Sequence, residues 1–235
     1  MKPKILLILA ATALSADAAT IGTWSASGGA NPGTDGWTLF TTGTSGQAGS
    51  FQGSSGSNGD GAGAGAGNPA WGFYANSDQF SSGVWNLAGG AITVGQQLGI
   101  DFDNGFVNNG KQVAIEFRQG TSVGLSIFFT GGASAYEVFS NGGVVNSGIG
   151  FTDNGFTILL DSTGSGTYSL GFDSFTQTGS YGNGVTAIDN IRVFNNSAGS
   201  GDAANLFVND IVVVPEPATA LLGSLGLLAL LRRRK

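Results

Sequence analysis

The sequence predicts an all-β fold, an antiparallel two-sheet sandwich of the jelly-roll type. Short segments such as 112–118 alternate apolar and polar side chains with period two, which is typical of half-buried antiparallel strands. Glycine supplies 42 residues, and turn-forming Asn-Gly and Asp-Asn-Gly sequences separate the segments. Residues 19–213 contain no sustained helical period, so the chain body is predicted to consist of strands joined by tight turns.

Ten segments are predicted as strands because they are rich in β-branched and aromatic residues and are bounded by turn sequences. They cover 71–75, 91–94, 97–103, 112–118, 123–129, 135–139, 156–161, 167–173, 187–194 and 206–213. No fixed repeat period is present, which favours a sandwich over an extended β-solenoid. Residues 19–213 are therefore predicted to form one β-sandwich domain.

A glycine-rich segment interrupts this pattern at residues 43–68. It includes an alternating Gly-Ala run at 61–67. Low side-chain bulk and high backbone entropy predict a flexible loop. A silk-like stacking segment is the alternative, but the alternating run is short for that structure.

The N-terminus has the order of a secretory signal peptide, predicted to cover residues 1–18. Lys2 and Lys4 form a positive region before the apolar stretch 5–14. Ala16 and Ala18 place small residues at the spacing that signal peptidase recognises, which predicts cleavage after Ala18. The apolar stretch is too short for a permanent membrane anchor.

The C-terminal segment 214–235 combines three features. Pro215, Glu216 and Pro217 precede an apolar run over 218–231, and four basic residues at 232–235 end the chain. The two prolines favour an extended, accessible backbone. A helix over the run would measure roughly 21 Å, short of the ~30 Å hydrocarbon core. The basic residues favour a cytoplasmic C-terminus, so we expect a marginal transmembrane helix and an exported chain body. An ordinary membrane anchor is the alternative.

This segment resembles the PEP-CTERM sorting signal of Gram-negative bacteria that make exopolysaccharide. The resemblance rests on the Pro215-Glu216-Pro217 triplet, the apolar run and the basic end. It implies that an exosortase, an integral-membrane cysteine transpeptidase, reads the triplet, cleaves near it and releases the protein outward. The implied route is an inner-membrane intermediate with a cytoplasmic C-terminus, followed by the cell surface or extracellular matrix.

Composition excludes several function classes. The chain contains no cysteine and no histidine, which excludes Ser-His-Asp and Cys-His catalysis, thiolate or imidazole metal sites and disulfides. Between residues 19 and 217, three cations face fourteen carboxylates, a net charge of about −11. Such a surface repels nucleic acid and anionic membrane. No cofactor is predicted, apart from the alternative of a structural calcium ion.

Four residues are candidate calcium ligands. Asp101 and Asp103 stand at alternate positions before Asn104-Gly105, and Asp189 and Asn190 are candidates from a distant loop. An EF-hand is excluded because the twelfth position from Asp101 is a glutamine. A calcium site assembled from these oxygens and a simple strand end followed by a turn are the two interpretations.

Aromatic side chains are the candidate glycan-binding residues, because sugar rings stack on their faces. Tyr181 is the first candidate, since it lies in a glycine-rich sequence that cannot bury it easily. Trp85 and Trp37 are further candidates, with an ordinary core role as the alternative.

Residues 71–213 also resemble concanavalin A-like and laminin-G-like jelly rolls. The resemblance rests on residues 71–76, 100–105 and 191–199. It implies a sandwich fold and suggests sugar binding by analogy. With the sorting signal, this predicts a non-enzymatic surface or matrix protein that is structural, adhesive or glycan-binding.

A glycan-cleaving enzyme is the alternative function. A glycosidase would use a carboxylate pair, and Glu116 and Glu137 are the only glutamates of the chain body before the sorting triplet. A lyase would use tyrosine and arginine chemistry. The same strand face carries Glu116 and Arg118, so a surface ion pair is the simpler interpretation.

Overall fold

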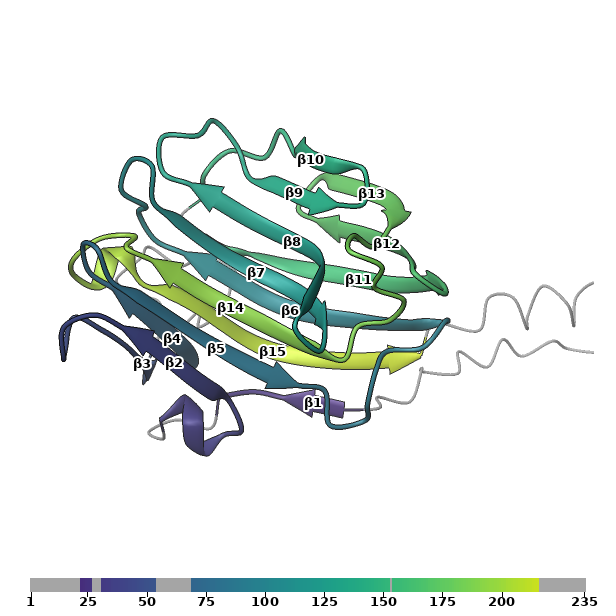
Figure 1. The fold of residues 1–235 in the computed structure, drawn as a ribbon, viewed down its shortest axis with the longest axis horizontal. Helices are drawn as coiled ribbons and strands as arrows, with labels where there is room; N and C mark the ends of the chain where they lie inside the picture. The colour runs from purple at the N-terminus through teal and green to yellow at the C-terminus, as the bar shows by residue number, and fades with distance from the viewer. Residues whose placement is uncertain (1–21, 27–30, 54–68, 153, 216–235) are drawn as a thin grey trace, which may run out of the picture. The chain divides into compact units, whose positions relative to one another are not determined.

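Two antiparallel sheets form the folded unit in a computed structural model that describes residues 22–26, 31–53, 69–152 and 154–215 (Figure 1). The first sheet has the order β13 (Phe175–Ser180), β12 (Thr167–Phe172), β11 (Phe156–Gly164), β6 (Gln96–Asn104), β15 (Leu206–Pro215), β4 (Ala70–Ala75) and β3 (Ala48–Gly53), and β1 (Gly22–Trp24) also pairs with β15. The second has the order β10 (Gly143–Asn146), β9 (Glu137–Ser140), β8 (Ser122–Thr130), β7 (Gln112–Gln119), β14 (Asn190–Asn196), β5 (Phe80–Asn86) and β2 (Thr38–Thr42).

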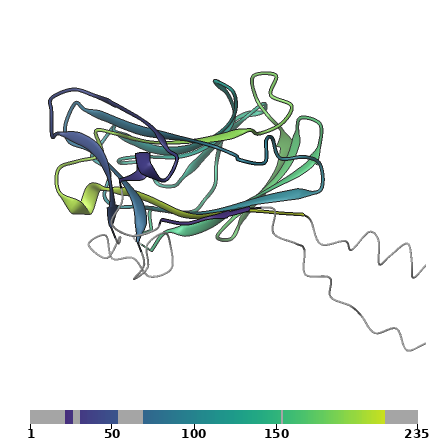
Figure 2. The same cartoon turned by 90° about the horizontal axis from the view of Figure 1, so that it is seen from below.

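The predicted all-β sandwich is confirmed, because these two sheets face each other as layers (Figure 2). The described residues add only the short 3-10 turns η1 (Pro32–Thr34) and η3 (Asp202–Ala204) to the strands. Every strand pairing is antiparallel, and the chain crosses between the sheets several times, as from β4 to β5 to β6. Distant segments therefore become neighbours, and β14 lies between β5 and β7.

The core lies between the layers. Alternate residues of β6 in the first sheet and of β7 in the second are completely buried. The indole rings of all four tryptophans form one cluster, in which Trp71 lies 5.4 Å from Trp85 and 5.5 Å from Trp37 between ring centroids. The four tryptophans thus contribute chiefly to packing at this end of the sandwich, beside β4 and β5.

Sequence periodicity missed β5 because its core-facing positions are not uniformly apolar. Ser81, Gly83 and Trp85 point inward, and a Cβ at Gly83 would lie 2.7 Å from the Phe73 ring. Gly83 therefore leaves space for the Phe73 ring of the opposite sheet. Because a serine and a glycine occupy two of the inward positions, β5 lacks the apolar–polar alternation from which strands were predicted. The short strands β1, β2, β10 and β13 were also missed.

The strand predicted at 91–94 is wrong. Only an isolated bridge joins Ile92 to Ile188. A turn follows at once, in which Gln96 N donates to Thr93 O at 3.0 Å and Gly95 has a φ of +81°. The chain reverses here before a strand can extend.

The flexible loop predicted at 43–68 also needs correction in its first part. Residues 48–53 form β3, which pairs with β4 in continuous register. Phe51 packs edge-on against Phe207 at 5.6 Å and lies across Gly72, where a Cβ would approach the Phe51 ring at 2.5 Å. The packing of Phe51 therefore stabilises a strand in a segment whose glycine content predicted a loop. Residues 54–68 lie outside the described residues.

Both predicted targeting segments lie largely outside the described residues, which begin at Gly22 and end at Pro215. The predicted signal peptide with Ala16 and Ala18, and the predicted C-terminal transmembrane helix, belong to these parts of the chain. Within the described ranges, no helix has both the length and the apolar character needed to cross a membrane.

Candidate functional site

The outer face of the second sheet is the surface that points away from the core. Paired residues of adjacent antiparallel strands share a face, so the register identifies the side chains on this one. One row runs across the sheet through Thr38, Val84, Arg192, Glu116, Ser126, Phe139 and Val144. The neighbouring row runs through Phe40, Ser82, Phe194, Ala114, Phe128, Glu137 and Asn146. This outer face therefore combines aromatic rings, small polar side chains and charges.

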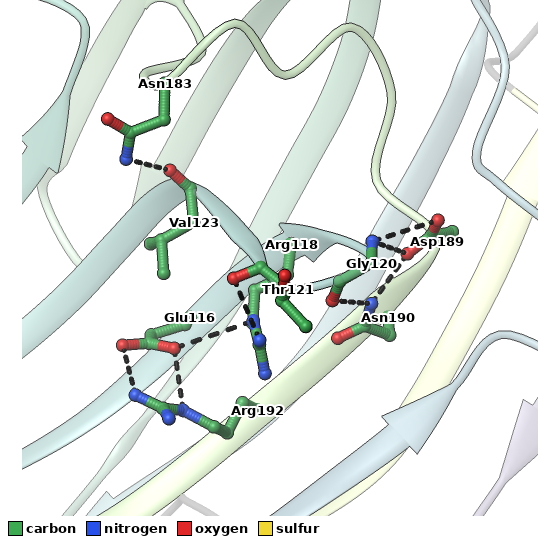
Figure 3. Close-up of polar contacts among 9 residues, drawn as sticks. All are labelled: Glu116, Arg118, Gly120, Thr121, Val123, Asn183, Asp189, Asn190 and Arg192. Atoms are coloured by element: carbon green, nitrogen blue, oxygen red, sulfur yellow. Dashed lines mark hydrogen bonds and ion pairs between the residues drawn. The ribbon is translucent and has the colours of Figure 1, made fainter.

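An ion-pair cluster stands near the middle of the outer face. Arg192 holds Glu116 through two contacts of 2.8 Å, one from Nη2 to Oε1 and one from Nε to Oε2 (Figure 3). Arg118 approaches the same carboxylate at 3.9 Å and donates from Nη2 to the carbonyl of Thr121 at 2.9 Å. One hydrogen bond and one ion-pair contact to the same carboxylate thus fix the orientation of the Arg192 guanidinium.

Burial differs sharply within this cluster. The side chains of Glu116 and Arg118 are each 10% exposed, whereas that of Arg192 is 31% exposed. Burial, followed by the charge of Arg192, lowers the pKa of Arg118 below its ordinary value, while Glu116 and Asp189 oppose the shift. Glu116 and Arg118 are therefore nearly buried, whereas Arg192, which contacts Glu116, reaches solvent.

Three phenylalanines extend from this cation toward the edge of the sheet. The Arg192 guanidinium lies 5.2 Å from the centre of the Phe194 ring, a cation–π geometry. Phe194 stacks on Phe80 at 5.7 Å, and Phe80 contacts Phe40 at 6.2 Å. Phe40 is 58% exposed on the edge strand β2. The result is an aromatic row that ends in solvent on one side and at an oriented guanidinium on the other.

The sequence revealed only part of this arrangement. It placed Glu116 and Arg118 on one strand face and predicted a surface ion pair between them. The two side chains are instead nearly buried and 3.9 Å apart, and Arg192 is the nearer partner of Glu116. Arg192 and Phe40 were missed as site residues, because their strands are remote in sequence. Only the pairing of β14 with β5 and β7 brings them together.

The three aromatic residues predicted to bind glycan are buried in the core. Tyr181 is 3% exposed and stacks on Tyr168 with ring centres 5.2 Å apart, and burial raises the pKa of Tyr181 far above its usual range. Trp85 and Trp37 pack within the tryptophan cluster. None of the three offers a ring face to a sugar. For Tyr181, the small residues Gly124 and Gly166 beside its backbone permit the close approach that the loop sequence did not indicate.

The four predicted calcium ligands do not form one site. Asp101 and Asp103 lie on β6 of the first sheet, whereas Asn190 begins β14 of the second and Asp189 immediately precedes it. Gly120 N donates to both carboxylate oxygens of Asp189, at 2.9 and 3.2 Å (Figure 3). Asn190 Nδ2 donates to the carbonyl of Gly120 at 2.9 Å. Asp189 and Asn190 therefore stabilise the turn between β7 and β8 through their hydrogen bonds to Gly120.

No group of three or more acidic side chains stands close enough to hold a metal ion in the part of the chain that the structure describes. Asp101 instead accepts a hydrogen bond from the hydroxyl of Thr157. Burial, and to a smaller extent Asp210, raise the pKa of Asp101 above its ordinary value, while the Thr157 bond opposes the shift. Its charged form is therefore disfavoured in the fold.

Replacing Asp101 with asparagine is expected to stabilise the fold slightly at pH 7, because it removes a charge that burial disfavours. A raised folded-state pKa means that protonation of Asp101 favours folding. The stabilisation that protonated Asp101 contributes is fully present below its unfolded-state pKa of about 3.8. It is lost as pH rises through the folded-state pKa of Asp101. Thermal unfolding of both chains at pH 7 and pH 3 measures this, and the gain should vanish at pH 3. An equal gain at both values would contradict the charge explanation.

Comparison with known proteins supports the sorting segment and the fold separately. Residues 213–235 match the PEP-CTERM protein-sorting motif, which confirms the motif predicted around Pro215, Glu216 and Pro217. This motif marks an exported protein that is held at the membrane, processed by an exosortase and then sorted to the surface. No curated protein matches the chain.

A sialidase and the HCR/D W1238A mutant are among the solved structures that share the sandwich fold. A sialidase is similar with a TM-score of 0.57 at 11% identity, over 86% of this chain and 19% of the sialidase chain. The HCR/D W1238A mutant is similar with a TM-score of 0.51 at 12% identity, over 85% of this chain and 49% of that chain. This protein thus spans about a fifth of the first chain and about half of the second. At such low identity, the similarity shows the jelly-roll fold alone.

Proposed function

We propose that the protein is a glycan-binding component of an exopolysaccharide-rich cell surface or extracellular matrix, and that the outer face of the second sheet is its binding surface. The observation that carries the proposal is the oriented, solvent-reaching guanidinium of Arg192 beside the Phe194, Phe80 and Phe40 row. Sugar rings stack their C–H faces on aromatic rings, and fixed polar groups bond their hydroxyls. Both elements are present on this surface.

The proposed route places the protein where such a ligand occurs. Signal peptidase would remove residues 1–18, and the basic residues 232–235 would keep the C-terminus cytoplasmic until an exosortase acts. The source would be an exopolysaccharide-producing Gram-negative bacterium, with its own exopolysaccharide as ligand. The acidic chain body disfavours nucleic acid as a partner.

We propose a binding role without catalysis. Arg192 engages both carboxylate oxygens of Glu116, and strand β8 separates Glu116 from Glu137, the other candidate of a glycosidase pair. The proposed surface needs no metal, so binding should be equal in calcium and in a chelator. New reducing ends or unsaturated products from the exopolysaccharide would instead support the glycosidase or lyase alternative.

Retention on immobilised polysaccharides tests this surface. The Phe40→Ala and Arg192→Lys variants should each bind about tenfold more weakly, which corresponds to about 1.4 kcal/mol. The first removes a ring face, and the second keeps the charge but loses the planar guanidinium that contacts both carboxylate oxygens of Glu116.

Phe106→Ala is the matched control, because Phe106 is 61% exposed but lies outside the two rows of the outer face. It should bind like the unaltered protein. If Phe40→Ala and Phe106→Ala bind equally well, or if no polysaccharide retains the unaltered protein, the proposed site is wrong.

A further inference from the structure

The two sheets carry opposite kinds of charge on their outer faces. Within the described ranges, three side chains are cationic: Lys111, Arg118 and Arg192. They belong to the second sheet or to the turn that leads into β7. Asp101 of β6 and Asp161 of β11 lie on the outer face of the first sheet, because they alternate with completely buried apolar residues. An anionic polymer is therefore repelled from that face and meets cations at the second sheet.

The ion-pair cluster on the second sheet has an excess of positive charge. Two guanidinium groups share one carboxylate, that of Glu116. Asp189 acts on the charge of Arg118 less strongly than Glu116 does, and its carboxylate already accepts two hydrogen bonds from Gly120 N. Glu137 lies two strands away from β7, roughly 10 Å, and the Debye length at physiological salt is about 8 Å. The carboxylates outside the cluster are thus largely screened from it.

Arg192 also keeps a donor group for a ligand. Its Nη2 and Nε are directed at Glu116, whereas its Nη1 makes no hydrogen bond within the part of the chain that the structure describes (Figure 3). The buried Nε of Arg118 likewise has no hydrogen-bond acceptor among the described residues, since Glu116 Oε2 lies 3.9 Å from it. A carboxylate placed against Arg192 would accept a charge-assisted hydrogen bond from Nη1 and would compensate the excess charge of the cluster.

We propose that the ligand of the outer face is an acidic polysaccharide, and that Arg192 donates from Nη1 to the carboxylate of one of its uronic acid residues. This inference rests on the proposed glycan-binding function and names the chemical class of the ligand. The row of Phe194, Phe80 and Phe40 extends away from the guanidinium. The carboxylate and the stacked rings therefore belong to successive sugars of one polymer chain. A neutral polymer would keep the stacking contacts but lack the charge-assisted hydrogen bond.

Polygalacturonate and its methyl ester separate the effect of charge from that of ring stacking. The two polymers have the same sugar rings, but esterification removes the negative charge of the carboxyl groups. Binding is measured on the immobilised polymers in a chelator, so that no divalent cation bridges protein and polymer. The protein should bind polygalacturonate about tenfold more tightly than the ester, and added salt should reduce this preference. Equal binding to the two polymers would overturn the inference.

Two variants locate the preference on the surface. Arg192→Gln should bind both polymers alike, because it removes the cation that meets the carboxylate. Lys111→Gln is the matched control, since it removes the same charge from a side chain that pairs with the exposed Asp78 at 3.1 Å. It should keep the tenfold preference. If Lys111→Gln lost the preference as fully as Arg192→Gln, net charge alone would attract the polymer, and the role of Arg192 would be wrong.

Phe40→Ala distinguishes a failure of this inference from a failure of the proposed function. It should weaken binding to both polymers by the same factor, so that the preference for polygalacturonate remains. If the unaltered protein binds both polymers equally and Phe40→Ala weakens both, the acidic ligand is wrong and the proposed surface stands. Retention on a neutral polysaccharide but not on polygalacturonate would have the same meaning. If neither an acidic nor a neutral polysaccharide retains the protein, both the inference and the proposed function are wrong.

Discussion

Replacing Trp71 with alanine is expected to lower the free energy of unfolding by about 3–5 kcal/mol. Trp71 is completely buried on β4 and contacts the rings of Trp37 and Trp85. Its Nε1 also donates to Asp35 Oδ2 at 2.8 Å. The substitution would leave a large cavity between the sheets and remove this hydrogen bond.

Urea unfolding followed by intrinsic fluorescence measures this loss. Phe106→Ala is the control, since it removes an exposed aromatic ring and should change stability by less than about 0.5 kcal/mol. If Trp71→Ala lost less than about 1 kcal/mol, the tryptophan cluster would not be the packing centre of this end of the sandwich.

Replacing Glu116 with alanine is the second large effect, with an expected loss of about 2–3 kcal/mol. Glu116 is the carboxylate that both Arg118 and Arg192 contact. Its removal would leave the nearly buried guanidinium of Arg118 beside a second cation. Solvent screens Arg192, which is partly exposed, so the loss should fall below that of a fully buried pair.

Two further variants test whether the unpaired charge of Arg118, and not a general loss of packing, causes the loss of stability. Glu137→Ala removes the other glutamate of the outer face, for which the described residues show no ion pair, and should cost less than about 0.5 kcal/mol. Adding Arg118→Met to Glu116→Ala should recover part of the loss, because it removes the unpaired cation. No recovery in the double variant would mean that charge burial does not dominate the effect.

These residues also show how far the sequence could predict the site. Period-two alternation along one strand placed Glu116 and Arg118 on the same face, since this relation is local. The partner that binds Glu116 more closely, Arg192, lies 76 positions away. No local pattern reports such a pairing, because it depends on β14 adding to β7.

For Tyr181, the exposure predicted from the sequence is wrong. Its glycine-rich surroundings indicated a loop, and loops are usually exposed. The structure keeps the loop but folds it inward, where Tyr181 stacks on Tyr168. Glycines permitted this burial because they let the backbone and ring approach closely.

The sequence by itself determined the all-β class and the sorting motif, because both depend on contiguous residues: alternation within a strand, and the order of triplet, apolar run and basic end. The tertiary structure decided which side chains share a surface. It buried the predicted aromatic residues and built the outer face around Arg192. It also showed that the last strand runs into the sorting triplet at Pro215. These results depend on long-range strand pairing, which joins residues that no local pattern relates.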